Sequence, residues 1–407
     1  MTASTSDPAA GRPSTDPVIK VVDLFSGAGG ISAGFREYRP QGRETSPFES
    51  LAAVEFDPAA AATYSANFGS SHVENVDIAD WEPGPDLVGN VDVIMGGPPC
   101  QGFSGLGKED PDDPRNLLWR EYMRVVTTIR PKIFVLENVD RFLKSQQFAD
   151  LKAATETGDL QDYTLVPKVL NAADYGVPQA RRRAIVIATR KELGEPLTHP
   201  EPTHEQNSNP SQERLDSGKR LEPWVGVGPE VFSKTPIDAP DKDLPERTGA
   251  PLGVKLPGPF KTADLHIGRR PTALSLARYA VIKPGGNRHD LRGETAEIDG
   301  KEVPLSTSSW DRHNSGSGDV MGRMHEDRPS VTIRTEFYKP EKGRYLHPKA
   351  DRPITHYEAA LIQGFPEDFL WYGSKVEIAR QIGNAVPIGL GKALAEAIHN
   401  YLSGRQA

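Results

Sequence analysis

The stretch VVDLFSGAGGISAGF, residues 21–35, decides the fold of this chain. It begins with consecutive apolar residues, as a strand buried on both faces does, and then enters a turn that contains Gly27, Gly29 and Gly30. A helical pattern follows from about Ile31. Because glycine lets the backbone turn tightly and approach a ligand closely, this order of strand, turn and helix predicts an α/β sheet with a ligand-binding turn.

The alternation of strand and helix patterns continues from Val18 to about Thr189. It predicts an α/β fold with a Rossmann-like, doubly wound and mostly parallel sheet. The stretches that alternate are VIKVVDLF, SAGFREY, LAAVEF, PAAAATYSANF, VDVIMGG, NLLWREYMRVVTTI, KIFVLENV and RRAIVIAT.

Residues 191–345 differ in texture, with frequent Pro, Gly, Asp, Lys and Asn and few long periodic segments, which predicts a smaller, loop-rich domain. A strand pattern at 330–337 closes this region. A helical pattern begins at Thr355, and Pro387 lies near the start of a last amphipathic helix. The predicted division is a disordered tail at 1–17, a large domain formed by 18–190 and 379–407, the loop-rich domain at 191–345 and a hinge at 346–378.

The composition of the 407 residues excludes several classes of protein. There is no apolar run of about 18 residues and no secretory leader, so we expect a cytoplasmic protein without a membrane span. The single cysteine, Cys100, cannot pair internally or supply the clustered thiolates of a zinc site, and we expect no metal. The formal net charge of -8 argues weakly against nucleic-acid binding, although basic residues cluster at 181–183.

The strand LAAVEF, which follows the glycine turn, ends in Glu55 and Phe56. An acidic residue at this place takes both hydroxyls of a ribose in dinucleotide-binding folds, and the neighbouring aromatic ring is placed to stack on an adenine. Two alternatives remain open on this motif alone. The glycine turn holds no ligand, or the protein is a nicotinamide enzyme.

The stretch VDVIMGGPPCQGFS, residues 91–104, presents Cys100 at the carboxyl end of a buried strand. A lone cysteine is more often a small core residue than a nucleophile. Here two prolines and three glycines surround it, which suits a rigid loop rather than a strand or helix interior. Ligands of open α/β sheets bind at the carboxyl ends of strands, and the context therefore favours a reactive thiol.

Further polar residues follow other strand patterns. Glu137 ends the strand KIFVLENV, facing the same edge as Cys100, although a surface cap or turn residue is an equal alternative. Gln179, Arg181 and Arg183 alternate along an extended segment, so the two arginines share one side, as they also would on a solvated strand face. The segment QIGNAVP, residues 381–387, precedes the last helix.

Taken in order, DLFSGAGG, the Glu55 strand, GGPPCQGFS, LENV, QARRR and QIGNAVP resemble the motif series of the DNA cytosine carbon-5 methyltransferases. The resemblance covers residues 18–190 and 328–398. Residues 190–325 match nothing, as suits the variable target-recognition domain of that family. The resemblance implies a Rossmann-like catalytic domain, a small recognition domain and a cleft between them for duplex DNA.

The resemblance implies S-adenosylmethionine as cofactor and S-adenosylhomocysteine as product. Glu55 would hold the ribose, Phe56 would flank the adenine, and Asn384 would lie near the amino-acid end. The full set of residues implied for cofactor binding is Phe25, Gly27, Gly29, Gly30, Glu55, Phe56, Asp77, Ile78, Pro99 and Asn384.

The resemblance also implies a catalytic set. Cys100 would add to carbon-6 of a cytosine rotated out of the duplex, and Glu137 would bind the N3 and amino edge of that base. Arg181 and Arg183 would position the base and its phosphate and favour the thiolate. The residues implied to contact the substrate are Gln101, Ser104, Asn138 and Gln179. The loop after Cys100, rich in Gly, Asp and Pro, is expected to close over the DNA.

The implied partner is double-stranded DNA, with a restriction endonuclease acting separately, and we expect a monomer associated with the nucleoid. Two rivals are a transfer-RNA cytosine methyltransferase and an inert DNA-binding protein of the same fold. The target sequence cannot be read from residues 190–325. The candidates for base or phosphate contact, each equally a solvated surface residue, are Arg312, His313, Arg323 and Arg334. One departure from the family is Tyr357, where an arginine is common before the glutamate.

Overall fold

The computed structural model describes residues 18–99, 118–206, 220–312 and 318–404. The predictions made for the tail at 1–17 and for Cys100, Gln101, Ser104 and His313 lie outside the described residues.

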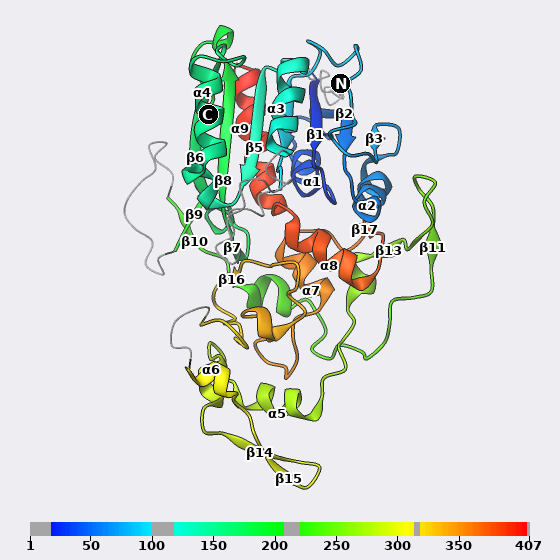
Figure 1. Cartoon of the computed structure of the whole chain (residues 1–407), viewed down its shortest axis with the longest axis vertical. Coiled ribbons are helices and arrows are strands. Elements are labelled where there is room, and N and C mark those ends of the chain that lie inside the picture. The colour runs from blue at the N-terminus through cyan, green and yellow to red at the C-terminus, as the bar shows by residue number, and fades with distance from the viewer. Residues whose placement is uncertain (1–17, 100–117, 207–219, 313–317, 405–407) are drawn as a thin grey trace, which may run out of the picture.

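A seven-stranded sheet in the order β3-β2-β1-β4-β5-β8-β6 forms the upper part of the molecule in Figure 1. Neighbouring strands are parallel from β3 to β5, whereas β8 runs antiparallel to both β5 and β6. The α/β class and the mostly parallel sheet are therefore confirmed. The strands are β1 (Ile19–Leu24), β2 (Phe48–Val54), β3 (Val73–Glu74), β4 (Val93–Gly96), β5 (Ile133–Asn138), β6 (Tyr163–Asn171) and β8 (Arg182–Arg190).

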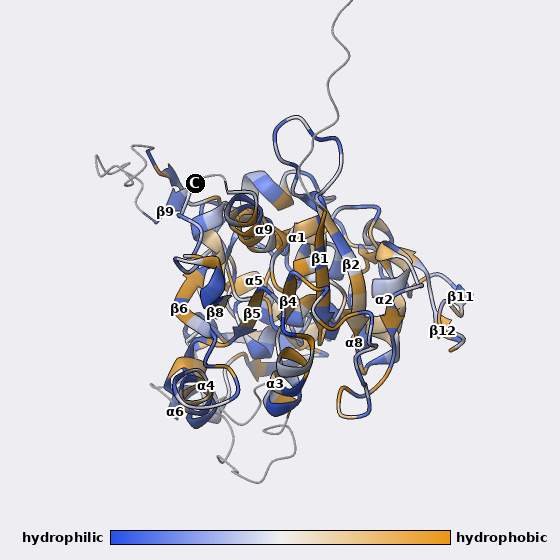
Figure 2. Cartoon of the chain, turned by 90° about the horizontal axis from the view of Figure 1, so that it is seen from above, coloured by the Kyte–Doolittle hydropathy of each residue, from blue (hydrophilic) through white to orange (hydrophobic). Residues whose placement is uncertain are grey.

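Helices cover both faces of this sheet. Viewed from above, α1 and α9 lie on one side and α3 and α4 on the other, with apolar strands between them (Figure 2). Each face packs its own apolar core, because successive strand residues point to opposite faces. The helices of this part are α1 (Gly30–Glu37), α2 (Pro58–Phe68), α3 (Leu118–Ile129), α4 (Gln146–Glu156) and α9 (Ile388–Leu402).

The lower part of the molecule is rich in loops and short strand pairs (Figure 1). Its longest described strands form a hairpin at the far end, β14 (Thr295–Ile298) with β15 (Lys301–Pro304). Its helices are α5 (Ala273–Val281), α6 (Ser308–Arg312), α7 (His356–Ile362) and α8 (Lys375–Asn384). The short strands are β7 (Gln179–Ala180), β9 (His204–Glu205), β10 (Glu222–Pro223), β11 (Thr248–Gly249), β12 (Leu256–Pro257), β13 (Phe260–Lys261), β16 (Ser330–Val331) and β17 (Leu370–Trp371).

The strand expected at 330–337 is much shorter than its pattern. Only β16 is extended, and the chain turns soon after it. The reason is that side chains replace the strand ladder at the next positions. Gln179 accepts the N–H of Ile333 at 2.9 Å, and Arg181 donates to the Ile333 carbonyl at 2.9 Å.

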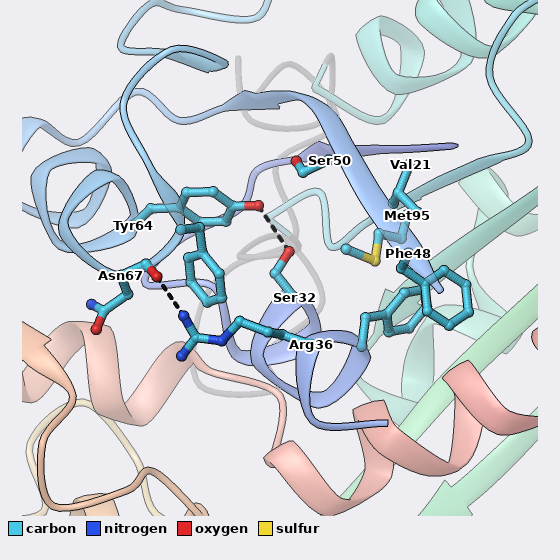
Figure 3. A pocket seen from close by; sticks show the side chains of 10 residues that line it. Val21, Ser32, Arg36, Phe48, Ser50, Tyr64, Asn67 and Met95 are labelled. Carbon is cyan, nitrogen blue, oxygen red and sulfur yellow. Dashed lines mark hydrogen bonds between the residues drawn. The ribbon is translucent and has the colours of Figure 1, made fainter. Parts of the chain in front are cut away.

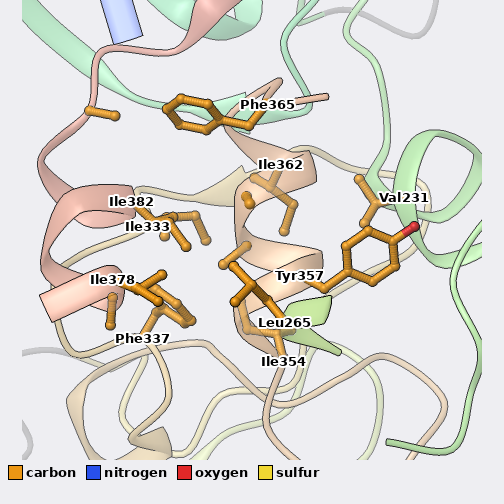
Figure 4. Packing of buried hydrophobic residues seen from close by; sticks show 14 of the residues in the cluster. Val231, Leu265, Ile333, Phe337, Ile354, Tyr357, Ile362, Phe365, Ile378 and Ile382 are labelled. Carbon is orange, nitrogen blue, oxygen red and sulfur yellow. The ribbon is translucent and has the colours of Figure 1, made fainter. Parts of the chain in front are cut away.

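Helix α7 is the centre of a large apolar cluster that includes residues of α1, α8 and α9. Thr355 caps the helix by accepting the N–H of Glu358, and the Glu358 carboxylate accepts the N–H of Thr355 in return. Ile362 points into the cluster, with Ile333 and Ile382 on the facing segments (Figure 4). The cluster therefore joins the lower part of the chain to elements that carry the sheet.

Arg352, in the loop before α7, pairs with Glu358, the residue that follows Tyr357. Its two terminal nitrogens donate to the fully buried Glu358 carboxylate at 2.9 and 2.7 Å. Tyr357 instead donates its hydroxyl to Glu367 at 2.7 Å. The buried Glu358 carboxylate is thus paired with a guanidinium from the loop before α7.

Arg323 is not a surface residue, which makes it a poor candidate for contacting DNA. Its side chain is buried and donates to four carbonyls, with the Tyr279 and Ile282 oxygens each at 2.6 Å, and to the Asp351 carboxylate at 2.8 Å. The guanidinium nitrogens are occupied by these internal hydrogen bonds, which hold loops of the lower part together. Arg312 and Arg334 are exposed.

Among the described residues, no helix is both long and apolar enough to cross a bilayer.

We expect Gly34→Ala to reduce the free energy of unfolding by about 1–3 kcal/mol, the range for overpacking. A Cβ on Gly34 would lie 2.5 Å from the Lys392 backbone nitrogen and 2.7 Å from the Ile388 carbonyl, so α1 and α9 would have to separate. Urea unfolding measures the loss. Gly318→Ala is the control, since a Cβ there meets nothing within 4 Å; equal losses in both variants would contradict the packing argument.

Arg352→Met should cost about 3–5 kcal/mol, because it leaves the Glu358 carboxylate buried without its partner. Arg270→Met is the matched control: Arg270 pairs with Asp241 at 2.8 Å, but both side chains are exposed, so its loss should cost about 0–1 kcal/mol. Comparable losses in the two variants would show that burial of the pair is unimportant.

The same pair predicts a pH dependence. Burial raises the pKa of Glu358, but the hydrogen bonds and charge of Arg352 outweigh it, and the pKa lies below its ordinary value of 4.5. Stability from the pair is present above that ordinary pKa and is lost as the pH falls through the folded-state pKa. The difference in unfolding free energy between the natural chain and Arg352→Met should therefore narrow on acidification. A gap that widens would refute this assignment.

Candidate active site

Four strand ends meet at one edge of the sheet. The parallel strands β1, β4 and β5 end side by side at Leu24, Gly96 and Asn138. Strand β8 runs the other way, so its first residues lie beside the last residues of β5, with Glu137 opposite Ile185. The antiparallel strand thus brings the arginine segment to the edge where open α/β sheets bind ligands.

Glu137 and Arg183 form an ion pair at this edge. The Arg183 Nε donates to Glu137 Oε1 at 2.7 Å, and the two side chains are 14% and 12% exposed. The other carboxylate oxygen lies over Gly97, where an added Cβ would approach it to 2.7 Å. Glycine at 97 is therefore needed for Glu137 to lie directly against the end of β4.

Asn138 ties the end of β5 to the segment that leads to Cys100. Its side-chain amide donates to the Pro98 carbonyl at 3.0 Å and is buried. Pro98 is buried, whereas Pro99 is exposed. The predicted contact of Asn138 with the substrate remains a prediction, while its observed partner is the backbone just before Cys100.

Arg181 is buried and acts on backbone carbonyls. It donates to Ile333 at 2.9 Å, to Gly383 at 3.0 Å and to Asn384 at 3.4 Å. Burial lowers the pKa of this guanidinium, nearby Arg183 lowers it further, and Glu137 opposes both effects. Arg181 therefore joins β7 and β8 to the end of α8, and its predicted contact with a base or phosphate stays a prediction.

Gln179 is fully buried between two segments. Its amide nitrogen donates to Gln363 Oε1 at 2.8 Å, and its oxygen accepts from Ile333. Gln363, which the sequence analysis did not single out, donates in turn to the Ile382 carbonyl. The signal was an amide directly after the apolar run AALI that ends α7. The substrate contact predicted for Gln179 is untested, and its observed bonds are internal.

On the other side of the edge, Glu55 connects two turns. Its carboxylate accepts the N–H of Gly27 at 2.8 Å and the N–H of Asp57 at 2.8 Å. Burial raises the pKa of Glu55, while these two N–H groups lower it. The glycine turn after β1 and the turn after β2 are therefore held in contact through one carboxylate.

These turns fit the adenosine and amino-acid parts of S-adenosylmethionine. A Cβ on Gly27 would meet nothing within 4 Å, so the turn is open on that side, and its φ of 55° suits glycine. The Phe56 ring is 71% exposed beside it. The Ser26 hydroxyl is buried and has no hydrogen-bond partner among the described residues, as a ligand-facing donor would. The donors and the exposed ring match a ligand with a ribose and a planar base.

The remaining residues predicted for the cofactor lie around these turns. Asn384 is exposed at the end of α8, and the Val386 carbonyl packs so closely on Gly30 that a Cβ would approach it to 2.4 Å. Asp77 accepts the N–H of Ala79 at 3.0 Å. The other positions are Phe25, half-buried with φ of 55°, Gly29, buried with φ of 83°, and Ile78, buried.

A cavity of about 190 Å³ lies between α1, α2 and the sheet (Figure 3). The Tyr64 hydroxyl is 2.9 Å from Ser32 Oγ, which donates to Asp23 at 2.6 Å. Burial raises the pKa of Asp23 to about 7. None of the described residues predicted to bind the cofactor lines this cavity. It is therefore separate from the candidate site.

Within the described ranges, no cluster of His, Cys, Asp and Glu is arranged to hold a metal ion.

Comparisons with known proteins identify the family of the chain. The model of the C-5 cytosine-specific DNA methylase family matches residues 19–400. The Type II methyltransferase M1.HphI of Haemophilus parahaemolyticus is 33% identical over 387 residues, covering 93% of this chain and 86% of the relative. The Type II methyltransferase M.DdeI of Desulfomicrobium norvegicum is 31% identical over 402 residues, covering 94% and 89%.

Among solved structures, a DNA modification methyltransferase encoded within a prophage of E. coli superposes with a TM-score of 0.63 at 23% identity. The match covers 94% of this chain and 99% of that one, and it supports the fold. This chain therefore belongs to the C-5 cytosine-specific DNA methylase family and is a DNA cytosine-5-methyltransferase that uses S-adenosylmethionine as its methyl donor.

Proposed function

We propose that the chain methylates carbon-5 of a cytosine that is rotated out of a specific duplex DNA sequence, through a covalent bond between Cys100 and carbon-6. The observation that carries the proposal is the ion pair of Glu137 and Arg183 beside Gly97, three residues before Cys100. A carboxylate and a guanidinium lie together at the sheet edge, and the thiol of Cys100 would border the same place.

The chemistry needs these groups because carbon-5 of cytosine is a weak nucleophile. The Cys100 thiolate adds to carbon-6, which makes carbon-5 an enamine carbon that can form a bond to a methyl group. Bound S-adenosylmethionine supplies that methyl on a sulfonium sulfur. Loss of the carbon-5 proton to a water or hydroxide then restores the double bond and expels the thiolate.

Glu137 would hold the N3 and amino edge of the base, where charge develops as the thiol adds. Arg183 would keep this carboxylate oriented by donating to one oxygen, and the other oxygen, which lies against Gly97, would face the base. Asn138 would place the backbone before Cys100, and Gln101 and Ser104 would contact the substrate from the segment after it.

Residues of the turns after β1 and β2 would bind the parts of S-adenosylmethionine as follows. Glu55 would bind the ribose, Phe56 would flank the adenine, and Asp77 would accept the adenine amino group. Asn384 would reach the amino-acid end from α8. The remaining surroundings would come from the other residues predicted for this site, Phe25, Gly27, Gly29, Gly30, Ile78 and Pro99.

The division of labour along the chain is also part of the proposal. Residues 18–190 and 379–407 would carry catalysis, 191–345 would read the target sequence, and 346–378 would serve as the hinge. We infer that the enzyme acts as a monomer on DNA in the cytoplasm, and that a separate restriction endonuclease cuts the unmethylated site. The Type II names of the relatives support the last point.

The first test incubates the chain with labelled S-adenosylmethionine and either duplex DNA or transfer RNA. We expect label in DNA alone, and Cys100→Ser should abolish transfer while cofactor affinity, measured by calorimetry, is unchanged. Duplex DNA containing 5-fluorocytosine should form a stable adduct with the natural chain only, because fluorine at carbon-5 cannot leave as a proton does. Labelling of RNA alone, or a Cys100→Ser variant with full activity, would refute the proposal.

A second test separates the two partners of the ion pair. Glu137→Gln should lower kcat about 10²-fold or more, as for loss of a group that transfers or shares a proton. Arg183→Lys keeps the positive charge but loses the planar donor, and it should lose less activity than Arg183→Met. Single-turnover rates on duplex DNA measure both effects. If Glu137→Gln turned over at the natural rate, the role given to the carboxylate would be wrong.

A further inference from the structure

Asp57 is the meeting point of three elements. Its Oδ1 accepts the N–H groups of Ala59 at 2.9 Å and Ala60 at 3.0 Å, which caps α2. Its Oδ2 forms an ion pair with Arg380 of α8. Its own N–H donates to Glu55. One residue therefore connects the start of α2 and α8 through its side chain and the turn after β2 through its backbone N–H.

The connection continues to the glycine turn. Glu55 bonds to the N–H of Asp57 with one oxygen and to the N–H of Gly27 with the other, each at 2.8 Å. A continuous chain of contacts thus runs from Gly27 through Glu55 and Asp57 to Arg380. Arg380 also lowers the pKa of Glu55, although burial and the two N–H groups have larger effects.

Helix α8 has a second anchor at its C-terminal end, within one turn of Arg380. Arg181 donates to the Gly383 carbonyl at 3.0 Å. Gly383 packs so closely on Thr335 that a Cβ would lie 2.4 Å from the Thr335 nitrogen. Arg380 precedes Asn384 by one turn and shares its side of the helix. Arg380 therefore lies where a rigid helix meets the turn that carries Glu55 and Phe56.

The stability of the chain does not require this ion pair. The Arg380 side chain is 50% exposed and that of Asp57 is 26% exposed, and ion pairs this accessible to water contribute little to folding. Phe56, in contrast, is 71% exposed and packs on little else. Asn75 holds the middle of the turn by donating to the Glu55 and Phe56 carbonyls at 2.9 and 3.1 Å, and Arg380 holds the side that faces α8 through Asp57.

We propose that Arg380 is a positioning residue for the cofactor. It holds the turn 55–57 against α8, so that Glu55 and Phe56 face Asn384 across the place of the ligand. The proposal rests on the cofactor roles proposed above for these three residues. Without Arg380 the turn must be ordered when the ligand binds, and that ordering weakens affinity without changing the reacting groups.

The test measures the Kd of S-adenosylhomocysteine by calorimetry in the absence of DNA. Arg380→Gln should raise it about tenfold, within the range of coupling between contacting residues. Arg380→Lys, which keeps the charge, should recover part of the loss. In steady state the KM for S-adenosylmethionine should rise while kcat at saturation stays within about twofold, the pattern for lost uniform binding.

Asp57→Asn completes a double-mutant cycle. The amide oxygen still caps α2, but the charge that pairs with Arg380 is gone, so this variant should raise the Kd as Arg380→Gln does. Combining the two substitutions should add little, because both remove the same contact. Fully additive effects would overturn the proposal.

Lys375→Gln is the matched control on the same helix. Lys375 pairs with the exposed Asp243 at 2.6 Å, one and a half turns before Arg380, and touches neither cofactor turn. The Kd of S-adenosylhomocysteine for Lys375→Gln should equal that for the natural chain. An equal rise in the Lys375→Gln and Arg380→Gln variants would overturn the proposal by showing a general effect on α8.

Glu55→Gln separates this inference from the assignments beneath it. If Glu55→Gln leaves the Kd unchanged, the ribose assignment fails and the role of Arg380 fails with it. If Glu55→Gln weakens binding and Arg380→Gln does not, only the role of Arg380 is overturned.

Discussion

The antiparallel pairing of β8 with β5 is the constraint on which the candidate site depends. Parallel strands alone would bring Gly96 and Asn138 to the same edge, as β4 and β5 do. The first residues of β8 reach this edge only because β8 starts where β5 ends. This antiparallel pairing sets Arg183 against Glu137. A parallel strand in that place would put its first residues at the opposite edge, far from the thiol-bearing segment.

Buried polar side chains take over where regular structure stops. Gln179 accepts the N–H of Ile333, and Arg181 donates to the Ile333 carbonyl. Arg181 also donates to the Gly383 carbonyl at the end of α8. The terminal nitrogens of the buried Arg181 guanidinium donate to these carbonyls, while its Nε has no partner among the described residues. The contacts of the terminal nitrogens hold three distant segments in one arrangement. Arg323 likewise is buried and donates to backbone carbonyls of several loops in the lower part.

The site is therefore assembled from two halves with different supports. The half proposed for catalysis lies on strand ends and is held by the hydrogen bonds of the sheet. The cofactor half is made of turns, and a run of contacts from Gly27 through Glu55 and Asp57 joins these turns to α8. The C-terminal segment serves both halves, because α8 carries the carbonyls that Arg181 binds as well as Arg380.

Sequence alone determined the α/β class and placed Glu55 and Glu137 at strand ends, because burial on both faces leaves an apolar run followed by a polar residue. It overextended the strand at 330–337 and treated Arg323 as exposed. Only the tertiary structure decided that Arg181 faces carbonyls, that Arg352 pairs with Glu358, and that Asp57 meets Arg380. The first and the last of these contacts join residues far apart in the chain, and neither composition nor periodicity records which distant partner satisfies a polar group.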